Sequence, residues 1–380
     1  ILIFDTITAL PFAKLRYDER PRKFALVKMM NIVIHLSSFV FFIALCPILY
    51  QKFPNTLLLS FYNPNYSISY YVIANILASV CTLFFLRKEI FSTPYSFDSA
   101  LWKKVMQYSL PLLIVGLGGM VNELLSRLCY TFLAVGSDAQ VRHELGVFSG
   151  VYRIVMMVNI FIFAYRMADE PFFFKKSVDA NAKEVYARLM KVFVIACCFI
   201  FLFITLFIDI WEIVLTLKSK AYAEAISIVP ILSLGSVFLG IYYNQSVWYK
   251  LSDQNKFGAY ITLGGALITI LANVILIPLY KYNGAAWANL LCYVFMMLTS
   301  YFLGQKYYPI QYPLKRILTY LFCILTMYLL HQLFSAYVAD VYLRIGAGSL
   351  LFGLFIFIVI RLDGNEFASL PMIGKYFVKR

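Results

Sequence analysis

Long apolar runs separated by short polar connections are the feature that most restricts how this chain can fold. A helix that crosses a bilayer needs about 20 mostly apolar residues. Eleven runs are predicted to be spanning helices, and the first of them is incomplete. They cover residues 1–13, 24–49, 70–86, 108–135, 145–168, 188–211, 222–249, 257–280, 284–303, 314–334 and 341–361. Because the connections are mostly short, they leave no room for a folded domain outside the membrane. The chain is therefore predicted to be an all-α polytopic membrane protein.

The composition agrees with a membrane environment. The 380-residue chain is 62% hydrophobic and 14% charged, whereas a soluble domain carries about 25% charged residues. The formal net charge of +14 would indicate a nucleic-acid partner in a soluble protein. Here the basic residues fall between the apolar runs, so the charge indicates orientation in the membrane, and no nucleic-acid partner is expected.

Lysine and arginine concentrate in every second connection. This set includes Lys14, Arg16, Arg20, Arg22, Lys23, Arg87, Lys88, Lys103, Lys104, Lys175, Lys176, Lys183, Arg188, Lys191, Lys250, Lys256, Lys306, Lys315 and Arg316. The alternate connections contain only Lys52, Arg142, Lys218, Lys220, Lys281 and Arg344. Cytoplasmic connections carry the excess of basic residues in membrane proteins. The pattern predicts a multi-pass membrane protein with these basic connections in the cytoplasm.

A short internal repeat predicts a two-lobed architecture. Residues 13–16 and 23–25 form a basic connection that resembles residues 249–252 and 256–259, six spanning segments later and in the same orientation. Parallel repeats of this kind are typical of transporters built from two similar lobes. The repeat predicts that three helices precede Ile1 in the intact protein. That protein would then have 14 transmembrane helices, arranged as two six-helix lobes plus two extra helices.

This architecture divides the chain into four parts. Residues 1–89 are predicted to be the remnant of the N-terminal lobe (helices 4–6), and residues 100–308 the C-terminal lobe (helices 7–12). Residues 312–362 would form two additional transmembrane helices, and residues 363–380 a cytoplasmic tail.

Several stretches together resemble one transporter family. Residues 4–16 resemble the fourth helix and following loop of bacterial polysaccharide flippases. The other matching stretches are Tyr108-Ser109-Leu110-Pro111, Leu145-Gly146-Val147-Phe148 leading to Tyr152-Arg153, Phe163-Ala164-Tyr165-Arg166 through Glu170-Pro171-Phe172-Phe173, and Asn283-Gly284-Ala285-Ala286-Trp287-Ala288. Their order and spacing resemble the polysaccharide and O-antigen flippase family of the multidrug/oligosaccharidyl-lipid/polysaccharide exporter superfamily.

The resemblance implies a transport function without a cofactor, in the bacterial inner (plasma) membrane. With three helices before Ile1, both termini of the intact protein would lie in the cytoplasm. Such a protein would carry an undecaprenyl-pyrophosphate-linked oligosaccharide to the periplasmic leaflet by alternating access, for O-antigen, lipopolysaccharide or other surface polysaccharide biosynthesis. The implied partners are this lipid-linked oligosaccharide, membrane lipids, a coupling ion (proton or sodium) and the polysaccharide assembly machinery.

Other functions stay open at this point. Within the same superfamily, the chain could be a peptidoglycan lipid II flippase or a drug/cation antiporter. The excess of arginine over acidic residues in the helices argues against an antiporter for organic cations. A membrane glycosyltransferase or polysaccharide polymerase would need catalytic groups on substantial outer loops, and the outer loops here are short, so an enzyme is not expected.

Ionisable residues inside apolar runs are the first candidates for a substrate cavity, because they are costly there and usually face a cavity or a partner. Glu123 and Arg127 are four residues apart and share one helix face. Arg153 lies at a matching depth on the next helix. Two guanidinium groups would suit a diphosphate. In the alternative interpretation, Glu123 simply neutralises Arg127.

Further polar residues extend this set. Arg166 is a candidate at the inner gate, although an ion pair with Asp169 or Glu170 would also explain it. Asn244 and Gln245 could line the cavity or bond to neighbouring helices. Asp5 is a candidate for ion coupling, with an interhelical hydrogen bond as the alternative.

Proline and glycine mark a candidate hinge in the run 108–135. Pro111, Gly116, Gly118 and Gly119 would permit either bending or close helix packing. The three histidines and seven cysteines show no metal-ligand spacing, so no metal and no catalytic site is expected.

Overall fold

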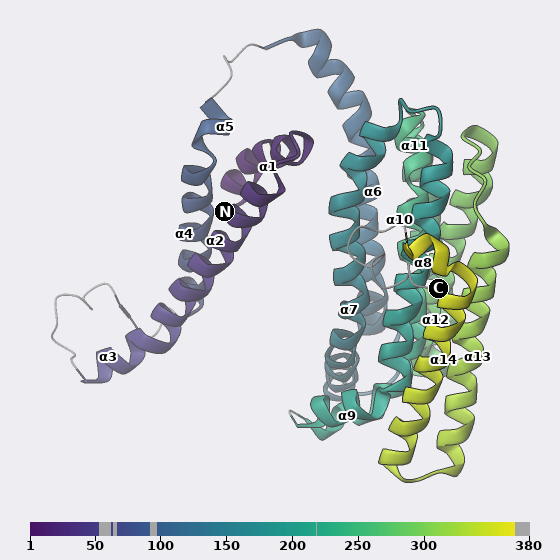
Figure 1. Ribbon diagram of the computed structural model, residues 1–380. Coiled ribbons are helices and arrows are strands. Elements are labelled where there is room, and N and C mark those ends of the chain that lie inside the picture. Colours follow the sequence, from purple (N-terminus) through teal and green to yellow (C-terminus); the bar gives the residue numbers. More distant parts are fainter. Residues whose placement is uncertain (53–61, 64–66, 92–96, 218, 369–380) are drawn as a thin grey trace. The chain divides into compact units, whose positions relative to one another are not determined.

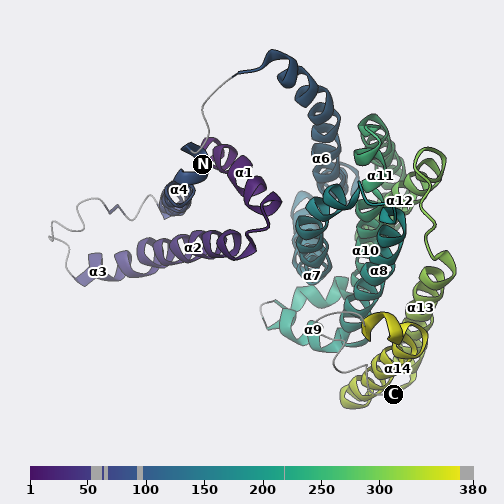
Figure 2. The ribbon, with the colours of Figure 1, turned by 45° about the horizontal axis from the view of Figure 1, so that its top comes forward.

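The computed structural model describes residues 1–52, 62–63, 67–91, 97–217 and 219–368, and for residues 67, 68, 120, 123 and 365–368 the backbone alone. The chain separates into two compact units, Ile1–Ser99 and Ala100–Arg380. Each unit is an assembly of helices (Figures 1 and 2).

The first unit contains α1 to α5. Their bounds are α1 (Leu2–Tyr17), α2 (Pro21–Val40), a π-helical turn (Phe41–Leu45), α3 (Cys46–Lys52), α4 (Ser67–Phe85) and α5 (Arg87–Phe91). Proline opens α2 at a position where its missing N–H is not needed. The turn and α3 continue α2, so one apolar stretch runs from Pro21 to Lys52.

Polar contacts connect the helices of this unit. Asn31 on α2 donates a hydrogen bond to Thr82 on α4 at 2.8 Å. The Lys23 ammonium at the start of α2 forms an ion pair with Glu89 on α5. Although burial opposes ionisation, the hydrogen bond from Lys23 holds the pKa of Glu89 below its ordinary value. These contacts join α2 to both α4 and α5.

The second unit contains the remaining helices. Their bounds are α6 (Ser99–Leu133), α7 (Asp138–Lys176), α8 (Ala182–Leu206), α9 (Ile208–Thr216), the 3-10 helix η4 (Lys220–Ile228), α10 (Val229–Gln245), α11 (Val247–Leu251), α12 (Asn255–Tyr307), α13 (Leu314–Tyr337) and α14 (Val341–Ala368). The backbone of α12 is broken at Lys281, which has a positive φ of 51°.

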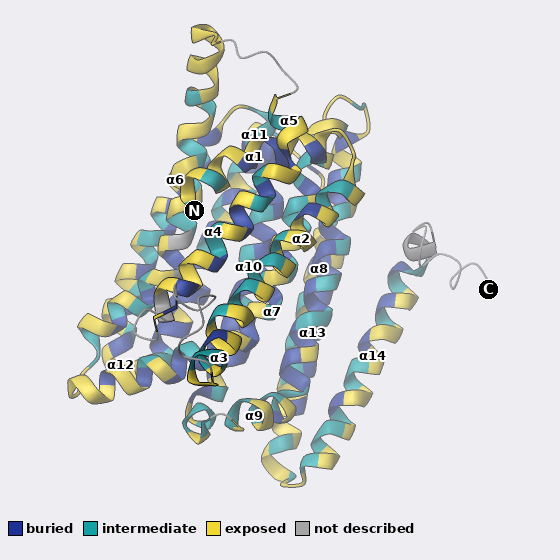
Figure 3. Cartoon of the chain, turned by 90° about the vertical axis from the view of Figure 1, so that its left-hand side faces the viewer, coloured by how far each residue is buried: buried dark blue, intermediate teal, exposed yellow. Residues whose placement is uncertain are grey.

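The core of the second unit lies along α7, α8 and α10. Val155, Leu202 and Val237 are completely buried in it. In contrast, few of the described side chains of α14 are buried, and most are exposed or intermediate, as its yellow and teal surface in Figure 3 shows. Many of the exposed side chains are large and apolar, including Phe302, Leu318 and Phe357. Contact of such a surface with water is unfavourable, whereas contact with lipid chains is favourable.

All eleven apolar runs lie mainly in helices, and the prediction of an all-α polytopic membrane protein is confirmed. Among the described residues, seven helices are long and apolar enough to cross a membrane. An eighth is added if the two parts of α6, Ser99–Gly119 and Leu124–Leu133, form one span across their 48° bend. The runs 257–280 and 284–303 are the two parts of α12. The division into lobes stays a prediction, and residues 369–380 of the predicted tail lie outside the described part.

Candidate functional site

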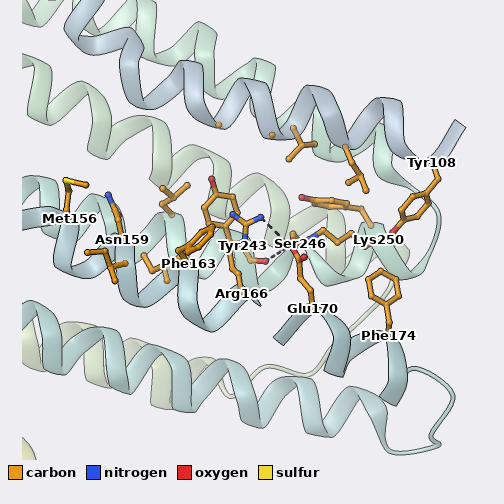
Figure 4. A pocket seen from close by; sticks show the side chains of 18 residues that line it. Tyr108, Met156, Asn159, Phe163, Arg166, Glu170, Phe174, Tyr243, Ser246 and Lys250 are labelled. Carbon is orange, nitrogen blue, oxygen red and sulfur yellow. Dashed lines mark hydrogen bonds and ion pairs between the residues drawn. The ribbon is translucent and has the colours of Figure 1, made fainter. Parts of the chain in front are cut away.

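A cavity of about 770 Å³ lies among α6, α7, α10 and α11 in the second unit. Most of its wall is apolar or aromatic, with Leu112, Val115, Ile160, Phe163 and Leu239 among the lining residues. Polar side chains are few. They include Tyr108, Asn159, Arg166, Glu170, Tyr243, Ser246, Tyr249 and Lys250 (Figure 4). An apolar cavity with a few convergent polar groups is the usual form of a ligand site.

Three charged side chains meet in this cavity. The Lys250 ammonium lies 2.6 Å from a Glu170 carboxylate oxygen, and the Arg166 guanidinium lies 3.7 Å from the same oxygen. The guanidinium also lies over the Tyr243 ring, 3.9 Å from its centroid. Figure 4 shows Arg166 and Lys250 converging on Glu170. These three lining groups carry two positive charges and one negative charge, and the Asp169 carboxyl group adjoins them in a neighbouring recess.

Two helices supply these charged groups. Arg166 and Glu170 come from α7, and Lys250 comes from the short helix α11. Asn159, Arg166 and Glu170 follow one another at intervals of seven and four residues, so they share a face of α7. Lys250 comes from α11, which is separated from α10 at Ser246. The Ser246 hydroxyl donates a hydrogen bond to the Tyr243 carbonyl at 2.6 Å. From α11, Lys250 meets Glu170, a residue that is 80 positions away in the sequence.

A second polar group lies behind the same wall. Asp169 is buried in a narrow recess that is also lined by Arg166, Glu170 and Lys250. Its carboxyl group is hydrogen-bonded to the Tyr165 hydroxyl, which in turn accepts a hydrogen bond from Asn244 at 3.2 Å. Asn244 therefore supports the cavity wall from α10 and is not among the lining residues.

The predicted arginines occupy three different environments. Arg166 lines the cavity. Arg153 is exposed and is not in the lining, but it lies two helical turns before Ile160, which is. The Arg127 guanidinium lies 4.7 Å from the centroid of the Tyr152 ring. The Tyr152 hydroxyl accepts a hydrogen bond at 3.1 Å from Asn159, a lining residue.

Other predicted site residues lie outside this cluster. The side chain of Glu123 is outside the described part of the structure, so its pairing with Arg127 stays a prediction. Gln245 is buried and does not line the cavity. Asp5, in the first unit, accepts a hydrogen bond from Ser79 at 2.9 Å, which joins α1 to α4. Its role in ion coupling stays a prediction.

The candidate hinge residues differ in their surroundings. A Cβ atom added at Gly118 would lie 2.5 Å from the Thr262 methyl group, so α6 and α12 approach closely there. At Gly116, which lines the cavity, an added Cβ would meet nothing within 4 Å. Gly119 faces the Tyr243 hydroxyl. The 48° bend of α6 follows Gly119, whereas Pro111 lies inside the preceding helical part. Movement at these positions stays a prediction.

Sequence reasoning missed Lys250 as a cavity residue and assigned it to a cytoplasmic connection. The pairing of Arg166 with Glu170 could be expected from their spacing of four residues. In the described part of the chain, no group of three His, Cys, Asp or Glu residues could hold a metal ion.

Two comparisons with known proteins bear on this fold and cavity. Residues 29–176 match the family model of polysaccharide biosynthesis proteins. The structure is similar to that of the lipid II flippase MurJ in an inward closed conformation, with a TM-score of 0.53 and 16% sequence identity. This similarity covers 94% of the present chain and 72% of the MurJ chain. A comparison with curated proteins gave no match.

The two findings are independent of each other. The family match comes from sequence and includes most of α2 and all of α7, whereas the similarity to MurJ concerns the fold of nearly the whole chain. Together with the seven apolar helices among the described residues, they indicate a multi-pass membrane protein whose fold is similar to that of MurJ. The family match covers residues 29–176 of the 380-residue chain, so it is this part of the chain that is similar in sequence to polysaccharide biosynthesis proteins.

Proposed function

We propose that the protein moves an undecaprenyl-pyrophosphate-linked oligosaccharide from the cytoplasmic to the periplasmic leaflet of the bacterial inner membrane. The observation that carries this proposal is the convergence of Arg166 and Lys250 in an otherwise mostly apolar cavity. A pyrophosphate group needs several strong donors, and guanidinium and ammonium groups supply them. The apolar and aromatic wall suits the less polar parts of the same molecule.

The charge pattern suggests the direction of loading. Arg166 and Lys250 lie toward the ends of α7 and α11 that meet the basic connections, which the positive-inside rule assigns to the cytoplasm. The pyrophosphate group would then enter from the side on which lipid-linked precursors are made. Alternating access would require the cavity to close on that side and open toward the periplasm.

The proposal is tested by complementation with the complete gene in a strain that lacks its own polysaccharide flippase. Surface glycan and the lipid-linked intermediate are both quantified. We expect restored surface glycan and loss of the accumulated intermediate. Arg166→Ala and Lys250→Ala should each reduce export about ten-fold or more, because a hydrogen bond to a charged group contributes about 1.5–3 kcal/mol.

The matched control is Lys315→Ala. Lys315 is an exposed residue of the same basic set, outside the cavity, so its loss changes the charge pattern without touching the site. Membrane levels of all variants are compared by immunoblot. Normal export by both cavity variants at normal levels would contradict the proposed role of the cavity.

Lipid II is the second candidate substrate, and the fold similarity to the lipid II flippase MurJ supports it. Both substrates are pyrophosphate-linked saccharides on a lipid, so the cavity variants would affect both. The two are separated by the strain used. Rescue of a strain depleted of its lipid II flippase, without rescue of polysaccharide export, would favour lipid II.

A further inference from the structure

The Glu170 carboxylate occupies the position in which an anionic ligand would meet the two cavity cations. The Lys250 ammonium and the Arg166 guanidinium both approach one oxygen of Glu170, at 2.6 Å and 3.7 Å. The Lys250 side chain is mostly buried, whereas that of Glu170 is 41% exposed. Glu170 is therefore the more accessible member of the pair, and it lines the cavity.

A buried ammonium group needs a counter-ion when no substrate is present, because an isolated charge is unfavourable away from water. Glu170 meets this need within the chain. Loss of the Glu170 charge would make the cluster of Arg166, Lys250 and Glu170 more positive by one unit, whatever the state of the neighbouring Asp169 carboxyl group. Such a cluster would hold any phosphate group more strongly.

We propose that Glu170 acts as an internal counter-ion that competes with the pyrophosphate of the substrate for Arg166 and Lys250. The substrate displaces the carboxylate on binding, and the carboxylate displaces the substrate on release. This assignment rests on the proposed function and adds to it a residue that limits affinity.

The surroundings of Glu170 allow this exchange. The contact with Arg166, at 3.7 Å, is longer than a direct hydrogen bond. The guanidinium group keeps its place over the Tyr243 ring when the carboxylate leaves, because that contact does not depend on Glu170. The partly exposed carboxylate can turn into the water of the cavity, where its charge is solvated.

The proposal predicts opposite effects on binding and on transport. Removal of the competing charge by Glu170→Gln should tighten pyrophosphate binding about ten-fold. The same change should slow release, so glycan export falls although binding improves. A purely structural Glu170 would give the reverse for binding, since its loss would disorder Arg166 and Lys250 and weaken the site. Glutamine keeps an oxygen that can accept the Lys250 hydrogen bond, which favours correct folding.

The experiment measures binding of inorganic pyrophosphate and of undecaprenyl pyrophosphate to the purified full-length protein in lipid nanodiscs. The variants are Glu170→Gln, Arg166→Ala and Lys250→Ala, with Glu212→Gln as control. Glu212 lies on α9 outside the cavity and loses the same charge. The expected result is tighter binding for Glu170→Gln, weaker binding for the two cation variants and no change for the control. The effect should shrink at high salt.

The possible failures are distinct. Wild-type binding that weakens in Glu170→Gln would overturn the counter-ion role and leave the proposed function standing. Equal tightening in Glu212→Gln would assign the effect to overall charge and also overturn it. Absence of binding of either probe by any form of the protein would overturn both the proposed function and this inference. Binding of inorganic pyrophosphate without the lipid-linked form would identify a free phosphate compound as the ligand, with Glu170 still tested by the sign of its effect.

Discussion

The Lys191 ammonium lies 2.8 Å from the Asp363 carboxylate, and both side chains are buried. The Tyr320 hydroxyl donates a hydrogen bond to the second oxygen of the same carboxylate. Lys191 belongs to α8, Asp363 to α14 and Tyr320 to α13. These two contacts therefore join the last two helices to α8, in the centre of the second unit. At the other end of α14, Arg344 forms an ion pair with Asp209 at 3.2 Å. Helix α14 is therefore attached to the rest of the unit near both of its ends.

Removal of one partner of the buried pair should destabilise the protein strongly. Asp363→Ala leaves the Lys191 ammonium without its counter-ion, and we expect a loss of about 3–5 kcal/mol. The double variant Lys191→Met with Asp363→Asn removes both charges and keeps an acceptor for Tyr320, so it should recover most of that loss. Thermal unfolding of the purified proteins in one detergent gives the comparison. A double variant no more stable than Asp363→Ala would show that the ion pair is not the cause.

Close packing at Gly118 should make this position intolerant of a larger residue. The Cβ of Gly118→Ala would lie 2.5 Å from the Thr262 methyl group. Thr262 cannot turn away freely, because its hydroxyl donates a hydrogen bond to the Gly258 carbonyl at 2.9 Å. We expect a destabilisation of about 1–3 kcal/mol. The matched variant Gly116→Ala meets no atom and should be about 0.5–1 kcal/mol more stable than wild type, because alanine favours helix. Equal unfolding temperatures for the two variants would contradict this difference.

The break in α12 should favour glycine over alanine at residue 281. Lys281 has φ 51° and ψ −133°, a conformation that side chains with a Cβ rarely adopt. Its ammonium lies 2.8 Å from Glu144, but the Lys281 side chain is 52% exposed, so this ion pair contributes little. Lys281→Gly and Lys281→Ala both remove the ammonium and differ in backbone strain. We expect the glycine variant to be about 1 kcal/mol more stable, since relief of strain exceeds the greater entropy of glycine in the unfolded chain. Chemical unfolding of the two variants measures this difference directly.

The helices of this fold could be predicted from the sequence because their signal is local. About 20 apolar residues in succession have few alternatives to a spanning helix, and the eleven runs lie mainly in helices accordingly. Irregularities were less predictable. The run 222–249 contains a 3-10 helix and a break at Ser246, which depend on packing against other helices and leave no clear pattern in composition.

The cavity could be predicted only in part, because its polar contacts join distant positions. Lys191 and Lys250 were both assigned to cytoplasmic connections from the charge pattern. Lys191 lies buried within α8 and pairs with a residue 172 positions away, which the charge pattern did not indicate. Lys250 meets Glu170 across 80 positions. Counting charges between apolar runs gives no information on such pairs. The pairing of Arg166 with Glu170, in contrast, could be predicted from their spacing of four residues on one helix.

Arg153 offers a last test, because it separates a role in transport from a role in stability. It is exposed on α7, on the helix face that carries Ile160 and Met156 of the cavity wall. Substitution of an exposed side chain changes stability by no more than about 0.5 kcal/mol. If this face continues the substrate path, Arg153→Ala should reduce glycan export several-fold with unchanged unfolding temperature.

Arg127→Ala should instead lower stability by about 0.5–1 kcal/mol, because the guanidinium stacks on Tyr152. Export and thermal unfolding are measured for both variants and for Lys315→Ala as the exposed control. Normal export by Arg153→Ala would limit the path to the cavity around Arg166, and equal stability of Arg127→Ala and wild type would remove the stacking contact as a stabilising feature.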